Sequence, residues 1–272
     1  MNNKQNLHTH TTYVDGKDTP EEIILECINR GFVGVGFSEH SYMPYSSLTD
    51  RFNDENVQKY KNEIASLKTK YNGIIDVFCG LELDYYSKVD LSGYDYIIGS
   101  VHYLDVGGKI VGFDRGLDET LNYINSYFDG DGLKFSKKYY ETLINYSTFN
   151  NIDILGHFDI FTKNNEKGKF IDTSSKQYLE LGFEAIHTLK GKIPLIEINT
   201  GAISRGYKKV AYPQIEFLKE FYNCGFGLVI TSDCHNKNFI DAYFDEAELL
   251  AKQVGFKSKW ILTNNGFKEV EI

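Results

Sequence analysis

Short apolar runs alternate with amphipathic segments along most of this chain. The apolar runs have the length of buried β-strands and lie at about residues 33–38, 75–83, 96–101, 152–156, 194–199 and 227–232. A first strand is predicted at residues 6–12, where Thr9, Thr11 and Thr12 are β-branched. Strands that alternate with helices favour a parallel sheet with right-handed crossovers.

The segments between these strands carry helix signals. Thr19 precedes Pro20 and two acidic residues, which is the pattern of a capped helix start, and Gly31 is placed to end that helix. Apolar residues recur at helical spacing in the other segments. Helices are predicted at about 53–70, 136–149, 174–190, around 215–221 and at 239–254, before a short strand at 259–262.

Residues 104 to about 132 are rich in Gly, Asp and Tyr and show no clear periodicity. We interpret this segment as an insertion that lies over an edge of the sheet, at the mouth of the predicted barrel. No linker, charge block, fixed repeat or low-complexity tract interrupts the chain, so residues 1–272 are expected to form a single domain.

Length and composition fit one α/β barrel. The chain has 272 residues, of which 42% are hydrophobic and 25% charged. Its formal net charge of −9, without a basic cluster, disfavours a nucleic-acid partner. Four dispersed cysteines, no signal peptide and no membrane-spanning run predict a cytoplasmic protein with reduced thiols and no membrane association. The oligomeric state is left open.

The histidines fall in a pattern that points to chemistry. Of the seven, His187 is placed inside a predicted helix, where a surface or interface histidine is expected. The other six lie at or just past the carboxyl end of a predicted strand, and they are His8, His10, His40, His102, His157 and His235. In a closed α/β barrel all these strand ends meet on one face, where active sites of this architecture are built.

Three carboxylates extend this set. Glu82 and Asp233 occupy equivalent strand ends, and Asp15 falls in the loop after the first strand. Imidazole and carboxylate ligands without thiolate suit Zn, Mn or Fe. Nine ligands exceed what one ion needs, and they divide over about three divalent ions if Glu82 bridges two of them.

Six motifs in family order make the chain similar to the polymerase and histidinol phosphatase (PHP) family over essentially its whole length. They are His8-Thr9-His10, Ser38-Glu39-His40, Gly80-Leu81-Glu82-Leu83-Asp84, Gly99-Ser100-Val101-His102, Gly156-His157-Phe158-Asp159 and Ser232-Asp233-Cys234-His235. The resemblance implies a distorted (β/α)7 TIM-like barrel with a trinuclear metal site.

By motif position, the resemblance implies the ligands of each ion. His8, His10, Glu82 and Asp233 would hold the first metal, and Glu82, His102 and His157 the second. His40, His235 and Asp15 would hold the third, although some relatives carry His where Asp15 stands.

Such a site predicts phosphoester hydrolysis. Three divalent ions outweigh three carboxylates, so the site would attract a phosphate dianion. A hydroxide bridging two ions would attack phosphorus while a cation neutralises the phosphoryl oxygens. Arg205 is the expected cation, and it would share the catalytic role with Glu82 and Asp233.

The chain further resembles the histidinol-phosphatase branch, which implies L-histidinol phosphate as substrate and a role in histidine biosynthesis. The resemblance lies in residues 199–206, Ser100-Val101-His102-Tyr103 and Gly112-Phe113-Asp114. Asp114 is the candidate to read the amine and imidazole, with Tyr103 and Phe113 as stacking neighbours. Asp84 and Asp159 are expected to orient ligand histidines.

Three other readings stay open. The chain could be another PHP phosphoesterase, such as a phosphotyrosine phosphatase or an oligonucleotide exonuclease. A metal hydrolase of another type on a similar barrel usually needs a carbamylated lysine, and no lysine stands at a predicted strand end. A non-catalytic metal-binding module is the third, and the complete ligand set argues against it.

Overall fold

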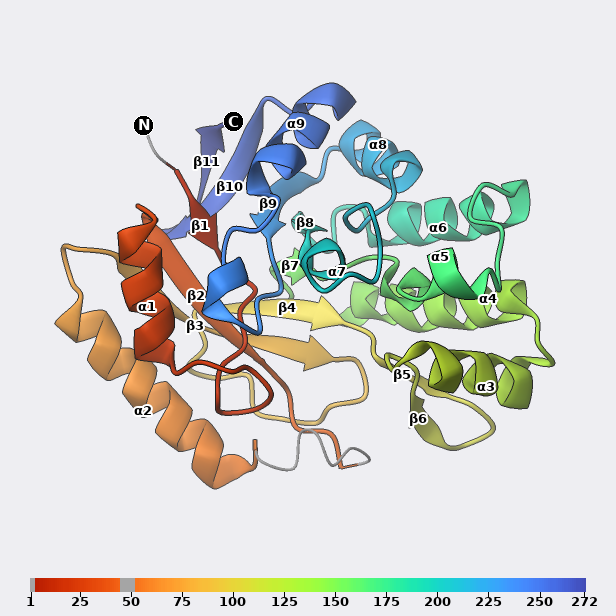
Figure 1. The fold of residues 1–272 in the computed structure, drawn as a ribbon, viewed down its shortest axis with the longest axis horizontal. Coiled ribbons are helices and arrows are strands. Elements are labelled where there is room, and N and C mark those ends of the chain that lie inside the picture. The colour runs from red at the N-terminus through yellow and green to blue at the C-terminus, as the bar shows by residue number, and fades with distance from the viewer. Residues whose placement is uncertain (1–2, 45–51) are drawn as a thin grey trace.

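The computed structural model describes residues 3–44 and 52–272 and shows a parallel sheet that curves into a barrel. Within these residues the sheet has seven strands in the order β1-β2-β3-β4-β7-β8-β9, with every neighbouring pair parallel (Figure 1). The strands are β1 (Gln5–Asn6), β2 (Gly34–His40), β3 (Asp76–Asp84), β4 (Tyr96–Ser100), β7 (Ile154–Leu155), β8 (Leu195–Asn199) and β9 (Gly227–Thr231).

The two edges of this sheet meet just beyond the ends of β1 and β9. Thr9 and Cys234 form an isolated parallel bridge. The His10 amide donates to the Cys234 carbonyl at 2.8 Å, and the Cys234 amide donates to the His8 carbonyl at 3.1 Å. The barrel is therefore nearly closed, and the predicted TIM-like fold is confirmed.

Helices cover the outside of the barrel (Figure 1). Helix α1 follows β1 and begins as predicted, because Thr19 and Glu22 form a reciprocal capping box ahead of Pro20. The longer helices are α1 (Pro20–Asn29), α2 (Asp54–Lys70), α3 (Leu117–Phe128), α4 (Gly132–Leu143), α6 (Lys176–Leu189), α8 (Ile215–Cys224) and α9 (Phe244–Val254). Shorter turns are α5 (Asn165–Gly168), α7 (Gly201–Ser204), η1 (Ile144–Thr148), η2 (Ile160–Thr162) and η3 (Lys237–Phe239).

The barrel interior is filled by its own apolar cluster, distinct from the core between strands and helices. Tyr96 crosses this interior and donates from its hydroxyl to the Leu7 carbonyl at 2.5 Å. Gly36 and Gly80 make room for the ring, because a Cβ would lie 2.8 Å from ring atoms at Gly36 and 2.2 Å from one at Gly80. Packing of this kind makes the barrel a solid support for side chains at its rim.

A hairpin closes the amino-terminal end of the barrel. It consists of β10 (Ser258–Thr263) and β11 (Gly266–Glu271), so the predicted short strand at 259–262 is part of a longer antiparallel pair. The Gln5 side chain, at the start of β1, exchanges two hydrogen bonds with the backbone of Leu262. Trp260 and Phe267 pack against the interior cluster. The opposite end, at the strand carboxyl termini, is the one left for a site.

The segment predicted as an irregular insertion is more regular than its sequence suggested. It contains β5 (Tyr103–Asp105), β6 (Ile110–Gly112) and α3 (Leu117–Phe128). Helix α3 buries one face through Thr120, Tyr123, Ile124 and Phe128. In the described part of the chain, no helix combines the length and the apolar character needed to cross a membrane.

Candidate metal centre

The strand ends bring the predicted ligands to one rim. His40 is the last residue of β2 and pairs in register with Glu82 on β3. His102 and His157 stand two residues beyond β4 and β7, and Asp233 stands two beyond β9. The predicted first strand is too long, since β1 ends at Asn6. The closing bridge at Thr9 nevertheless keeps His8 and His10 on the rim.

Glu82 lies at the centre of the group. Its Oε1 is 2.9 Å from His157 Nε2, and 3.4 Å from both His8 Nε2 and His102 Nε2. Its Oε2 is 2.6 Å from His40 Nδ1. A single carboxylate that is almost fully buried thus faces four imidazoles within 3.4 Å, and the Nε2 of a fifth, His10, lies 3.6 Å from its Oε2.

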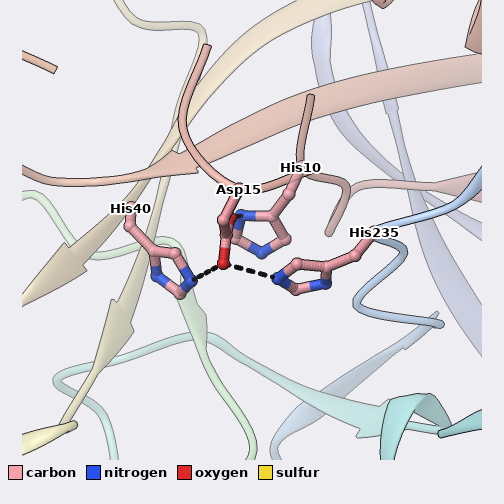
Figure 2. Close-up of side chains that lie close together, drawn as sticks. All are labelled: His10, Asp15, His40 and His235. Carbon is pink, nitrogen blue, oxygen red and sulfur yellow. Dashed lines mark ion pairs between the residues drawn. The ribbon is translucent and has the colours of Figure 1, made fainter. Parts of the chain in front are cut away.

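Asp15 forms a second meeting point, shown in Figure 2. Its Oδ2 is 3.2 Å from His235 Nε2 and 3.7 Å from His40 Nε2, and its Oδ1 is 3.8 Å from His10 Nδ1. The loop after β1 therefore does reach the mouth of the barrel, as the sequence predicted for Asp15.

Asp233 lies between the imidazoles around Glu82 and those around Asp15. Its Oδ1 is 3.3 Å from His10 Nε2, 3.5 Å from His235 Nδ1 and 3.8 Å from His8 Nε2. The backbone of Asp233 is left-handed, with φ at 47°, a conformation that Asp tolerates better than most side chains. This local turn directs the carboxylate to the centre of the rim immediately after β9.

The donor set fits divalent metal ions. Buried His8 Nε2, both ring nitrogens of His10 and Asp15 Oδ1 have no hydrogen-bond partner among the described residues, which would be costly for polar atoms with no other ligand. Two ligands at metal distances of about 2.1 Å and a tetrahedral angle lie about 3.4 Å apart, close to many of the separations above. Four groups of three or more ligand atoms form from the nine predicted residues.

Charges alternate across the rim. Burial opposes ionisation of Glu82 and Asp233, but the pKa of Glu82 is held well below its usual value by His40 and His8, and that of Asp233 by Arg205 and His8. Burial and the charges of His235 and His40 lower the pKa of His10 to about 3. Burial would also lower the pKa of His40, but Glu82 and Asp15 outweigh it and raise that pKa to about 10. Ionised Glu82 and Asp233 and neutral His10 are therefore in the forms that bind metals, while His40 has to release its proton to do so.

Glu197, which the sequence reasoning passed over, holds the base of the site together. This fully buried residue of β8 lies 3.0 Å from His8 Nδ1 through its Oε2. Its Oε1 accepts from the His157 amide at 2.6 Å. A carboxylate at Nδ1 favours the His8 tautomer whose Nε2 lone pair faces Glu82 and Asp233. A charged residue within the apolar run 194–199 is the sequence signal that could have revealed it.

Asp84 and Asp159 were predicted to orient ligand histidines, and the structure shows what each of them contacts. Asp84 accepts from the His102 amide at 2.7 Å, so it does position a predicted ligand. Asp159 instead accepts from the Gln214 amide at 3.2 Å, and burial raises its pKa. Glu39, also passed over, accepts from the Thr11 amide and hydroxyl next to His10.

A cavity of about 270 Å³ opens on the rim. It is lined in part by the predicted substrate-binding residues Tyr103, Asp114 and Arg205. Arg205 donates to Asp233 Oδ2 at 2.7 Å and to the Gly201 carbonyl. Asp114 Oδ1 is paired with Lys163 Nζ at 2.7 Å. The prediction for Phe113 is wrong, because this buried ring packs against Phe135, Tyr123 and Tyr139 and does not line the cavity.

Comparison with known proteins agrees with this geometry. A family model described as "PHP domain" matches residues 6–201. The chain belongs to the PHP domain family. This PHP chain is 25% identical to a Deinococcus radiodurans protein named "Probable histidinol-phosphatase", over 91% of the chain and 92% of that protein. It is also 25% identical to a Schizosaccharomyces pombe protein of the same name, over 88% of the chain and 82% of that protein.

A solved structure shares the fold of this PHP chain. It is the histidinol phosphate phosphatase of Lactococcus lactis subsp. lactis, complexed with zinc, L-histidinol and phosphate. The TM-score is 0.74 at 20% identity, and the match covers 97% of this chain and 98% of that one. At this identity the likeness establishes the fold.

Proposed function

We propose that this chain is a metal-dependent phosphomonoesterase that hydrolyses L-histidinol phosphate to L-histidinol and phosphate. The observation that carries the proposal is the rim itself, where six histidines and three carboxylates line or adjoin one cavity. The names of the full-length relatives and the zinc, L-histidinol and phosphate of the Lactococcus structure support the substrate.

The proposed centre holds about three divalent ions, chosen from Zn, Mn and Fe. Its ligands are His8, His10, Asp15, His40, Glu82, His102, His157, Asp233 and His235. When bound, such ions supply a water nucleophile that is activated near neutral pH and positive charge opposite the phosphoryl oxygens. Glu82 connects ligand groups on both sides of it, which supports its role as a bridging carboxylate.

Arg205 is the proposed phosphate-binding cation. Asp233 and the Gly201 carbonyl fix two of its donors, while nearly a third of its side chain remains exposed in the cavity. An anchored guanidinium can present its remaining N–H groups to phosphoryl oxygens. Its charge is then in position as negative charge on the phosphoryl group grows.

Asp114 is the proposed reader of the cationic end of the substrate. Burial opposes its ionisation, but Lys163, His102 and Arg205 lower the pKa of Asp114, so its carboxylate is charged at neutral pH. Lys163 occupies Oδ1, and a carboxylate has further acceptor sites for a substrate amine. Tyr103 lines the same cavity and is the proposed neighbour of the imidazole.

A phosphate-release screen tests this function. Metal-loaded protein is offered L-histidinol phosphate, phosphotyrosine, p-nitrophenyl phosphate and a short oligonucleotide, and the metal content of the same sample is measured. We expect the highest kcat/KM with L-histidinol phosphate. Preference for phosphotyrosine or the oligonucleotide would transfer the chain to another activity of the family, and preference for the neutral ester would remove the histidinol assignment.

A further inference from the structure

A second group of metal-type ligands lies away from the rim, between helices α6 and α8. We propose that His187, Glu220 and Cys224 form a separate site for a thiophilic divalent cation such as Zn²⁺. This site is independent of the proposed phosphatase chemistry, and none of its residues lines the rim cavity.

The topology places the three side chains on one small patch. Glu220 and Cys224 are four residues apart on α8 and therefore share a helix face. His187 lies in the last turn of α6, which packs against α8 (Figure 1). One donor atom from each residue lies within 4.8 Å of the other two.

The distances suit a cation with a small adjustment. Glu220 Oε1 is 3.8 Å from Cys224 Sγ, and a tetrahedral zinc with usual bond lengths places oxygen and sulfur ligands about 3.6 Å apart. His187 Nε2 is 2.6 Å from Glu220 Oε1, where two zinc ligands would be about 3.4 Å apart. The His187 side chain is 58% exposed, so it has room to move outward by that difference.

The chemistry of the group favours zinc over magnesium or calcium. Thiolate, imidazole and carboxylate together are the donor types that zinc takes, whereas hard cations prefer oxygen alone. Among the four free cysteines, Cys27, Cys79 and Cys234 are buried, while Cys224 is partly exposed. The carboxyl ends of two helices also meet here, and the negative ends of their dipoles attract a cation.

The position of the patch indicates a stabilising role. Cys224 ends α8 just before β9 begins at Gly227, so the patch lies near the amino-terminal end of the barrel strands, opposite the rim. In barrels of this type the amino-terminal face contributes to stability, while the chemistry takes place at the carboxyl-terminal face. A cation held by both helices would bind the folded state and so stabilise it.

Cobalt provides a specific probe, because a cysteine ligand gives Co²⁺ a charge-transfer absorption in the near ultraviolet that histidine and carboxylate ligands do not. Holoenzyme kept reduced by a phosphine is titrated with Co²⁺. Wild type should develop this absorption and saturate at one equivalent per chain. Cys224→Ser and His187→Ala should lose or strongly weaken it, while both keep phosphatase activity within about twofold of wild type.

Asn223→Ala is the matched control. Asn223 is a neighbour on the same helix that hydrogen-bonds the other oxygen of Glu220 without offering a metal ligand, so its variant should retain the band. Zn²⁺ should raise the Tm of wild-type holoenzyme by about 2–4 °C and leave that of Cys224→Ser unchanged. A wild type without the band, or a band that persists in Cys224→Ser, would overturn the proposal.

Discussion

Glu82 is the residue on which the rim depends most. It faces His8, His40, His102 and His157 at 2.6–3.4 Å with almost no exposure to solvent. These four rings come from four different strand ends and meet at this one carboxylate. The role of a bridging ligand can therefore be tested at this one position.

Glu82→Gln should lower kcat/KM for L-histidinol phosphate by more than about 100-fold. Losing a partner that only supports a ligand costs about 10–100-fold, and losing a bridging ligand should cost more. Circular dichroism and elemental analysis on the same sample check the fold and the metal content. Asp15→Ala should be milder and affect one ion, and near-normal turnover of Glu82→Gln would remove Glu82 from the centre.

Glu197→Gln should weaken metal binding by about 10–100-fold without disturbing the fold. The amide oxygen of Gln can still accept from the His157 amide, but its NH₂ group would donate to His8 Nδ1. That bond favours the tautomer with a proton on Nε2, the nitrogen that faces Glu82 and Asp233. Competition with a chromophoric chelator measures the zinc affinity.

Thr231→Val is the control for Glu197→Gln. The Thr231 hydroxyl donates at 2.7 Å to Glu197 Oε2, the oxygen that also faces His8, and the valine variant removes this bond while the Glu197 carboxylate is retained. We expect a smaller loss of zinc affinity than in Glu197→Gln. Equal zinc affinity in Glu197→Gln and wild type would show that Glu197 has only a structural role in the barrel and does not tune the metal ligands.

The two ends of the substrate should respond to different variants. Arg205→Ala should depress turnover of every phosphomonoester, because it removes charge that acts on the transition state.

Asp114→Asn should raise KM for L-histidinol phosphate by up to about tenfold and leave the KM for p-nitrophenyl phosphate nearly unchanged. Lys163→Met frees the Asp114 carboxylate from its partner, so it should shift the ratio of the two KM values in the opposite direction. If Asp114→Asn weakens both substrates equally, Asp114 is not the specificity residue.

At the level of elements, an ion-pair group fixes α1 to the loop before α9. Asp241 accepts from Lys4 at 2.8 Å and from Arg30 at 2.6 Å, and these three side chains are 17–30% exposed. Burial opposes ionisation of Asp241, but Lys4 and Arg30 lower its pKa. Its contribution to stability is therefore present above the unfolded pKa and is lost as the pH falls through the folded one.

Asp241→Asn should lower the free energy of unfolding by about 1 kcal/mol at pH 7. The difference from wild type should shrink as the pH falls below about 4, where the carboxyl of the unfolded wild-type chain begins to take up its proton before the folded one does. Urea unfolding at several pH values measures it. Glu55→Gln, which breaks an exposed pair with Lys59, is the control and should change stability by less than about 0.5 kcal/mol. A loss that is the same at every pH would exclude the ionic explanation.

The elements also show where sequence reasoning succeeds. Buried strands and capped helices have local signals, so β2, β3, α1 and α2 begin and end within about two residues of the prediction. Helix α3 was missed because its apolar face is mostly Tyr, Ile and Phe in a segment crowded with Gly and Asp. Helix α4 starts at Gly132, four residues before the predicted start, because Asp131 caps it.

The site divides in the same way. Strand-end position is visible in the sequence and predicts eight of the nine rim residues, while Asp15 is predicted from its place in the loop that follows the first strand. Pairings between distant side chains are not visible, so the partner of Asp114 and the burial of Phe113 could not be foreseen. The contacts of Glu197 depend on the register of β8 with its neighbours, and register is a property of the closed sheet.

At the scale of the whole molecule, the barrel separates two tasks. The hairpin of β10 and β11 and the interior cluster close its amino-terminal end, while the carboxyl ends of the strands hold the ligands and the cavity. Closure between Thr9 and Cys234 brings His8 and His10 next to Asp233, so the centre forms only when the barrel does. Folding and metal binding should therefore be coupled.

We propose above that metal ions at this rim carry out the hydrolysis of L-histidinol phosphate. The most direct test titrates metal-free protein with Zn²⁺ or Mn²⁺ and follows phosphate release from L-histidinol phosphate, with bound metal counted at each point. We expect no release without metal and a rise that levels off at about three ions per chain. Full activity in metal-free protein, or none at any metal loading, would exclude a metal-dependent L-histidinol phosphate phosphatase at this rim.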